Sequence, residues 1–196
     1  MNTSSPGGEK PPSDSSPAGT VLLSDNAIRR ALTRIAHEIV ERNEDSQSVV
    51  LLGIQAGGVP MCVRLTKTLE EIWGHPVPQG ALDISMHRDD LNQRAAPKVL
   101  PTHIPFDVTA KTVVLVDDVV FSGRTIRAAM DSLHDFGRPA RIQLAALVDR
   151  GHRELPIKAD FVGKNIPTSA TDKVRVRLNE VSGSDEVILE REGAES

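Results

Sequence analysis

The chain has 196 residues, of which 39% are hydrophobic and 26% are charged, and its formal net charge is -4. This length fits one domain with a core of ordinary size. The acidic balance argues against a protein coated in positive charge for nucleic acid, but it leaves room for one basic face. No apolar stretch approaches the roughly 20 residues of a membrane helix, and the N-terminus lacks the apolar segment of a secretory signal. The single cysteine, Cys62, cannot form an internal disulfide bond. A cytoplasmic protein is the simplest interpretation.

The first 19 residues are rich in Ser, Pro and Gly, a composition that predicts a disordered tail. We expect residues 20–196 to form one domain. Its first element is predicted to be an amphipathic helix over residues 24–43. The apolar residues that recur at helical spacing on one face of this helix are Ile28, Leu32, Ile35 and Ile39.

Strands and helices then alternate along the chain. A Gly-rich turn, QAGGVP, is followed by a helix that runs to about residue 73, and a second helix is expected at about 124–136. The polar, Pro-containing residues 87–103 are expected to form a long loop. VRVRL and EVILE, joined by SGSD, predict a C-terminal hairpin. The sequence predicts the remaining strands at residues 49–54, 80–86, 111–116, 141–148 and 159–163.

This alternation indicates an α/β fold with a central, mostly parallel sheet that is flanked by helices. Ligands of such sheets bind beyond the carboxyl ends of the strands. QAGGVP and DDVVFSGRT both follow buried strands, so we expect the functional site to include both segments.

The segment DDVVFSGRT has the chemistry of a sugar-phosphate site. Residues 121–125 lead into a helix, whose first amides lack internal partners and favour an anion such as a phosphate monoester. Asp117 and Asp118, just before, are suited to accept hydrogen bonds from vicinal hydroxyl groups. The alternative is that the two aspartates only cap or solvate a turn. The apolar strand before them and the Ser-Gly-Arg-Thr helix start after them favour the ligand site.

These residues carry a resemblance. VVLVDDVVFSGRT resembles the phosphoribosyl diphosphate (PRPP) binding motif of type I phosphoribosyltransferases. LDISMHRDDL, residues 137–169 and the C-terminal hairpin are similar to one branch, the bacterial pyrimidine operon attenuation regulators that double as uracil phosphoribosyltransferases. The resemblance covers residues 22–192 and implies the type I phosphoribosyltransferase fold, with a small hood. It further implies binding of PRPP, uracil, UMP, UTP and pyrimidine-operon leader RNA by a homodimer or a higher homo-oligomer.

The resemblance also implies roles for single residues. Asp117 and Asp118 would hold the ribose hydroxyls, and magnesium would arrive with PRPP near them, without a direct protein site. Arg88 and Asp89 would act in catalysis from a loop that closes over the site. The implied diphosphate loop is Ala56, Gly57 and Gly58. The implied phosphate loop is Val119, Val120, Phe121, Ser122, Gly123, Arg124 and Thr125. The implied base site is Arg150, Phe161, Val162 and Gly163, with a stacking ring and backbone groups aimed at the base. The implied RNA contacts are Arg29, Arg30, Arg34, His37, Arg138, Arg141 and Arg153.

Two departures leave alternatives open. The family has Thr-Arg-Gly where this chain has Ala56-Gly57-Gly58, and it has Tyr where this chain has His87. Losing one charge-assisted hydrogen bond, worth about 1.5–3 kcal/mol, would weaken catalysis. Restoring Thr and Arg at positions 56 and 57 is therefore expected to raise activity. One alternative is a regulator with little or no catalysis. Another is a salvage enzyme without RNA binding, in which the helix arginines only form a solvated face.

Overall fold

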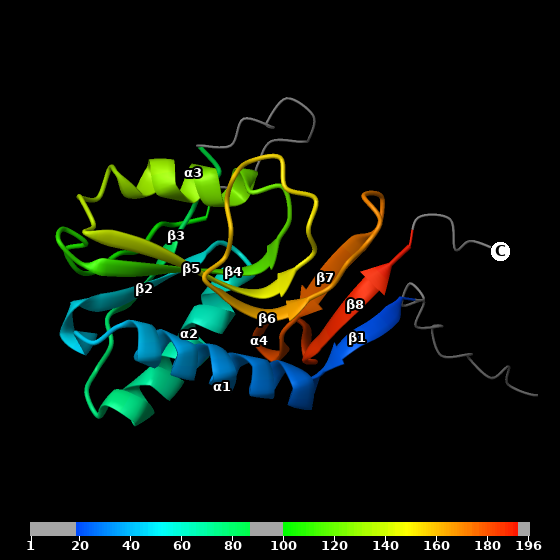
Figure 1. Ribbon diagram of the computed structural model, residues 1–196, viewed down its shortest axis with the longest axis horizontal. Coiled ribbons are helices and arrows are strands. Elements are labelled where there is room, and N and C mark those ends of the chain that lie inside the picture. The colour runs from blue at the N-terminus through cyan, green and yellow to red at the C-terminus, as the bar shows by residue number, and fades with distance from the viewer. Residues whose placement is uncertain (1–18, 87–99, 192–196) are drawn as a thin grey trace, which may run out of the picture.

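The computed structural model describes residues 19–86 and 100–191 (Figure 1). The expectation of a disordered tail at residues 1–19, and most of the loop predicted at 87–103, lie outside the described residues. The strands are β1 (Thr20–Ser24), β2 (Val49–Ile54), β3 (Gln79–Leu82), β4 (Thr112–Val120), β5 (Arg141–Asp149), β6 (Phe161–Asn165), β7 (Lys173–Arg177) and β8 (Glu186–Glu190). The helices are α1 (Asp25–Arg42), a short 3-10 turn η1 (Ser46–Ser48), α2 (Gly58–Trp73), α3 (Arg124–Leu133) and α4 (Asn179–Ser182).

Five strands form the central sheet in the order β3-β2-β4-β5-β6, and every neighbouring pair is parallel. The predicted α/β fold with a parallel sheet is confirmed. Because the sheet is covered on both faces, its central strands contain long apolar runs, and all six residues of β2 are buried.

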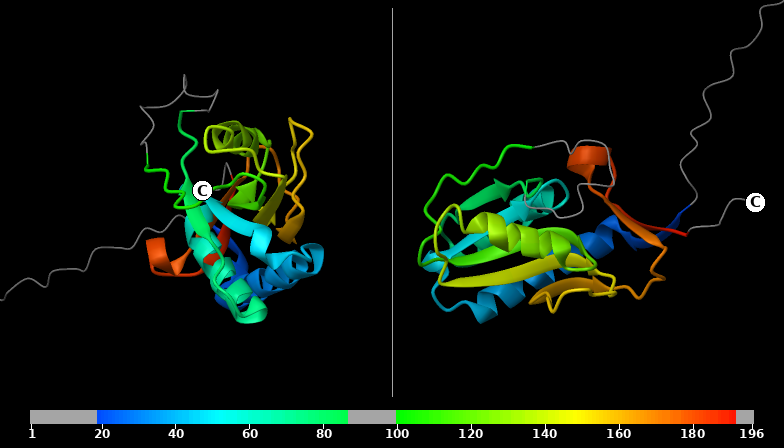
Figure 2. Two further views of the ribbon diagram at one scale, coloured as in Figure 1. Left: turned by 90° about the vertical axis from the view of Figure 1, so that its left-hand side faces the viewer. Right: turned by 90° about the horizontal axis from the view of Figure 1, so that it is seen from above.

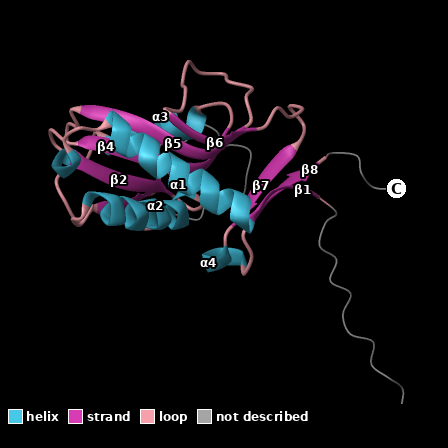
Figure 3. Ribbon diagram, turned by 60° about the horizontal axis from the view of Figure 1, so that its bottom comes forward, coloured by secondary structure: helices cyan, strands magenta, loops and turns pink. Residues whose placement is uncertain are grey.

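Helices α1 and α2 cover one face of the sheet and α3 covers the other (Figures 1 and 3). The α1–α2 side has a core that includes Ile35, Leu65 and Val116, and the α3 side has a core that includes Leu115 and Ile126. Leu115 and Val116 are neighbours in β4 but lie in different cores, because successive side chains of a strand point to opposite faces of the sheet. None of the helices in the described part of the chain is long and apolar enough to cross a membrane.

A second, three-stranded antiparallel sheet stands beside the first, in the order β1-β8-β7 (Figure 2). The predicted C-terminal hairpin is confirmed as β7 and β8, with α4 inserted in its turn. The pairing of β1 with β8, in which Thr20 lies opposite Leu189, was not predicted from the sequence. The second sheet packs its apolar residues Leu178 and Val187 into the α1–α2 core.

Several boundaries differ from the sequence predictions; β6, for example, covers Phe161–Asn165 rather than residues 159–163. β4 does not end at residue 116 but continues to Val120, so both aspartates belong to the strand itself. α3 ends at Leu133 rather than at 136, because the chain tightens into a turn before Gly137, where φ is 145°. β3 covers Gln79–Leu82 rather than residues 80–86, and its Ala81 also forms an isolated antiparallel bridge with His103.

Candidate active site

The carboxyl ends of β2 and β4 lie side by side because the two strands are parallel neighbours. The loop after β2 contains a cis peptide bond between Gln55 and Ala56 and enters α2 at Gly58. A Cβ added at Gly58 would be 2.1 Å from the carbonyl oxygen of Val116 in β4. The loop can therefore lie against β4 only because this position is glycine.

The two aspartates of β4 serve different sides of the site. Asp117 is 6% exposed and lines a pocket with the loop that follows β4. Asp118 is partly buried and lies against Gly57 of the loop after β2. The backbone also uses these carboxylates: Asp117 Oδ1 accepts a hydrogen bond from the Asp118 amide at 3.0 Å, and Asp118 Oδ1 accepts one from the Val119 amide at 2.9 Å.

Burial raises the pKa of Asp118, and the hydrogen bonds from Val119 and Asp117 only partly oppose this effect. Burial therefore disfavours the ionised carboxylate of Asp118 unless a bound group compensates its charge. Ribose hydroxyl groups or a cation would supply that compensation.

The loop between β4 and α3 lines a pocket of about 330 Å³. It surrounds the N-terminus of α3, whose N-cap residue Gly123 has a φ of 93°. Amides at a helix N-terminus and a left-handed glycine are typical of phosphate cradles. The pocket lining consists of Asp117, Val119, Val120, Phe121, Ser122, Gly123, Arg124, Thr125, Ile126 and Glu154.

Residues 149–155 form a wall beside this pocket: Glu154 lines the pocket itself, and residues 149–152 line a second pocket of about 400 Å³. The Arg150 guanidinium lies 4.2 Å from the centre of the Phe121 ring, and its Nη2 donates to the carbonyl oxygen of Ser169 at 2.9 Å. Burial lowers the pKa of Arg150. The Glu154 amide donates to the carbonyl oxygen of Ser122 at 3.0 Å, so the wall is bonded to the phosphate loop.

Comparison with known proteins decides the family. A family profile described as phosphoribosyl transferase domain matches residues 20–180. The chain is 58% identical to "Bifunctional protein PyrR" of Chloroflexus aurantiacus over 174 residues, which are 88% of this chain and 96% of that protein. This chain belongs to the PyrR branch of the phosphoribosyltransferases. It is also 55% identical over 175 residues to the PyrR protein of Thermus thermophilus, covering 88% of this chain and 97% of that one.

The fold of the family is seen in solved structures as well. A hypoxanthine phosphoribosyltransferase of Trypanosoma cruzi superposes with a TM-score of 0.68 at 19% identity, covering 89% of this chain and 97% of that one. This likeness concerns the fold alone. The predicted type I phosphoribosyltransferase fold is confirmed.

The expected base-site residues lie in different surroundings. Phe161 is 2% exposed and its ring lies in the α1–α2 core, with the Arg42 guanidinium 5.9 Å from the ring centre. Its role toward a base stays a prediction. The carbonyl oxygens of Val162 and Gly163 accept hydrogen bonds from Arg34 Nη2 at 3.0 and 2.6 Å. Of the predicted base residues, Arg150 lies against Phe121 and lines a neighbouring pocket of about 400 Å³ together with residues 165–168.

The predicted PyrR RNA contacts fall in two places. Arg29, Arg30, Arg34 and His37 are exposed on α1. Arg141 lines a pocket at the C-terminal end of α1, and Arg138 is exposed just before it. Arg153 lies beyond the opposite end of β5, where it donates to the carbonyl oxygen of Phe121 and to Asp149, both at 2.6 Å. Arg153 therefore braces the active-site wall.

Within residues 19–86 and 100–191, no cluster of three or more His, Cys, Asp or Glu is suited to hold a metal ion. Asp117 and Asp118 offer two carboxylates. That number fits Mg²⁺, which uses one or two protein carboxylates and completes its shell with substrate phosphates and water. The catalytic residues expected at Arg88 and Asp89 lie outside the described residues.

Three supporting residues of the site were not identified from the sequence. Asp149 holds Arg153, Thr168 Oγ1 accepts a hydrogen bond from Arg150 Nε at 3.1 Å, and Glu154 pairs with Arg124 at 2.7 Å. The signal was present in the segment DRGHRE, which carries both arginines next to acidic residues. Its spacing alone gives no indication that it folds back over the phosphate loop.

Proposed function

We propose that this chain transfers the phosphoribosyl group of PRPP to uracil, releasing diphosphate and UMP. The observation that carries the proposal is the placement of two aspartates between two anion-binding loops at adjacent strand ends. The loop after β4 would take the 5'-phosphate, Asp117 and Asp118 the ribose hydroxyls, and the loop after β2 the diphosphate. The PyrR relatives, named as bifunctional, support this assignment.

In the proposed reaction, a ring nitrogen of uracil forms a bond to C1 of the ribose. The C1–oxygen bond to the diphosphate breaks, and the proton of that nitrogen leaves to solvent or to the diphosphate. Positive charge develops on the ribose ring, and the carboxylates of Asp117 and Asp118 lie where they would stabilise it. The two loops fix both ends of PRPP, so that the reacting atoms are held in place. Mg²⁺ bound with PRPP would neutralise charge on the departing diphosphate.

The base would occupy the space next to Arg150 and Phe121. The guanidinium is stacked on the Phe121 ring and fixed by Thr168 and Ser169, so its plane is held in one orientation. A planar guanidinium is suited to lie along one edge or face of a planar base.

We also propose that the chain binds the leader RNA of a pyrimidine operon and that uridine nucleotides promote this binding. The exposed residues Arg29, Arg30 and His37 on α1 favour a phosphate-binding face despite the net charge of -4. A gel shift with such a leader, with and without UMP, tests this proposal. Retardation that is equal with and without UMP would remove the regulatory part of the proposal.

Steady-state formation of UMP from uracil, PRPP and Mg²⁺ tests the enzyme, with Asp118→Asn as the control. We expect turnover by the parent chain and its loss in the variant. Absence of turnover, with UMP still bound in a calorimetric titration, would favour a nucleotide-sensing regulator without catalysis. Turnover without RNA retardation would favour a salvage enzyme.

A further inference from the structure

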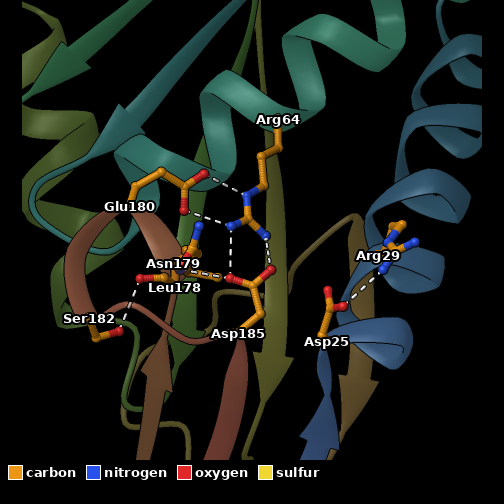
Figure 4. A network of polar contacts seen from close by, with 8 residues as sticks. All are labelled: Asp25, Arg29, Arg64, Leu178, Asn179, Glu180, Ser182 and Asp185. Carbon is orange, nitrogen blue, oxygen red and sulfur yellow. Dashed lines mark hydrogen bonds and ion pairs between the residues drawn. The ribbon is translucent and has the colours of Figure 1, made fainter.

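One arginine joins helix α2 to the turn of the second sheet, at a point away from the proposed substrate sites (Figure 4). Arg64 of α2 reaches the turn between β7 and β8. Its Nε and Nη2 donate to the two oxygens of Glu180 at 2.8 and 2.6 Å. Its Nη1 and Nη2 donate to the two oxygens of Asp185 at 2.6 and 2.8 Å. We call Arg64, Glu180 and Asp185 the Arg64 clamp.

The geometry of the clamp is that of a rigid connection. Both carboxylates are held through two hydrogen bonds each, which fixes their orientation as well as their distance. The Asp185 side chain is 11% exposed and that of Arg64 is 24% exposed, so solvent screening is reduced relative to a surface pair. Exposed single pairs such as Arg29–Asp25, at 67% and 56% exposure, lack these features.

The clamp also organises the turn it holds. Asp185 Oδ1 accepts a hydrogen bond from the Asn179 amide at 2.7 Å, at the first residue of α4. Ser182 Oγ donates to the carbonyl oxygen of Leu178 at 3.0 Å. Without Arg64, Asp185 would lose its cation, and the turn would lose its attachment to α2.

The two ends of the clamp lead to the two sides of the active site. Arg64 lies six residues after Gly58, about 9 Å along α2 from the proposed diphosphate loop. At the other end, Leu178 and Val187 flank the held turn, and they belong to the core against which Val119 packs. Val119 directly follows Asp118. The clamp thus joins the helix that carries one loop to a turn whose flanking residues share a core with Val119, the neighbour of Asp118.

We propose that Arg64 is a positioning residue that holds the proposed diphosphate loop in register with Asp118 by fixing α2 to the β7–β8 turn. This inference rests on the proposed function of the two loops. Arg64 itself touches no substrate. It acts through the angle and distance between α2 and the second sheet, and lysine cannot replace it, because one ammonium group cannot form two bidentate pairs.

The test is the variant Arg64→Met, with Arg175→Met as the matched control. Arg175 forms an ion pair with Glu190 at 2.6 Å inside the same second sheet, but it does not reach α2. We expect Arg64→Met to raise the KM for PRPP by about 10-fold with a smaller change in kcat, since misplacement of a loop weakens substrate positioning. Arg175→Met is expected to leave both constants near those of the parent. Arg64→Lys is expected to lie between parent and Arg64→Met.

Hydrogen exchange supplies a readout that does not depend on activity. Faster exchange in Arg64→Met is expected both at residues 179–185 and at residues 56–58 and 117–120. Faster exchange at 179–185 alone, with an unchanged KM, would overturn the proposal and leave a local structural role. If Arg64→Met does not fold, Glu180→Gln removes half of the clamp at an exposed position and is held to the same two outcomes. If the parent chain forms no UMP, the proposed function fails, while the exchange pattern still decides the clamp.

Discussion

Gly57 lies directly against the carboxylate of Asp118. A Cβ placed on Gly57 would be 2.3 Å from Oδ2 and 2.4 Å from Cγ of Asp118. These distances are far below a van der Waals contact, so a side chain at position 57 must displace the loop or the carboxylate. Asp118 thus occupies the space that a side chain at position 57 would need. This contact argues against the expectation that Gly57→Arg, combined with Ala56→Thr, raises activity.

The first prediction concerns Gly57→Ala. The added methyl group pushes Asp118 away from its position, and we expect kcat/KM for PRPP to fall by about 100-fold, the effect of misplacing a positioned group by about 1 Å. Steady-state UMP formation measures the change. Gly74→Ala is the control: its φ of 73° strains an alanine, but nothing lies within 4 Å of the added Cβ. An equal loss of activity in Gly74→Ala would assign the effect to stability and remove the role of the contact.

The second prediction concerns Asp118→Asn and stability. Burial raises the pKa of Asp118 in the folded chain, so the folded state binds its proton more tightly than the unfolded state does. Protonation of Asp118 therefore stabilises the folded chain. This stabilisation is fully present below the unfolded pKa and is lost as pH rises through the folded pKa. Asparagine has no charge to bury, and its oxygen still accepts the Val119 amide. The Tm of Asp118→Asn is therefore expected to exceed that of the parent at neutral pH, although activity is lost.

Calorimetry across a pH series checks this prediction. The difference in Tm should shrink as the pH is lowered and Asp118 takes up its proton. A variant that melts below the parent at neutral pH would show that the ionised carboxylate is already compensated in the free protein.

The third prediction concerns acid and the Arg64 clamp. Hydrogen bonds from Arg64 lower the pKa of Glu180 and of Asp185. Groups with a lowered folded pKa stabilise the fold above their unfolded pKa, and this stabilisation is lost as pH falls through the folded pKa. Arg64→Met should therefore lose Tm at neutral pH and differ less from the parent in acid. Identical acid profiles for the two proteins would contradict the short contacts of the clamp.

The fourth prediction concerns Cys62. Burial raises the pKa of its thiol to about 12, and the residue is 1% exposed beneath the loop that precedes α2. A neutral, enclosed thiol is a poor nucleophile. Iodoacetamide should leave the folded protein unlabelled and label it fully in denaturant, as followed by mass spectrometry. Rapid labelling of the native protein would show that this part of α2 opens.

The order of strands and helices was predictable because it depends on local periodicity. Apolar runs such as VVLLGI can only be buried strands in a chain of this kind, and the helix beginning near Ser24 has one apolar face. The site at DDVVFSGRT was predictable for the same reason, since a helix start after a buried strand has a defined chemistry. The phosphoribosyltransferase fold followed from these segments and the resemblance.

The remaining features depend on contacts between distant residues. Phe161 begins a five-residue strand too short to indicate which face it turns inward, and the structure places its ring in the core. Arg153 was grouped with RNA contacts because exposure cannot be judged from the sequence; it is in fact bonded to Asp149 and Phe121. The approach of Gly57 to Asp118 joins a loop and a strand that are far apart in the chain.

The pairing of β1 with β8 has a consequence for how the molecule is made. β8 is the middle strand of the second sheet, and it is nearly the last described segment of the chain, whereas β1 is the first. During synthesis, β1 has no hydrogen-bonding partner until β8 has been made. The central sheet can assemble before then, but the second sheet closes only afterwards, and a chain truncated before β8 would leave β1 an exposed edge open to other molecules.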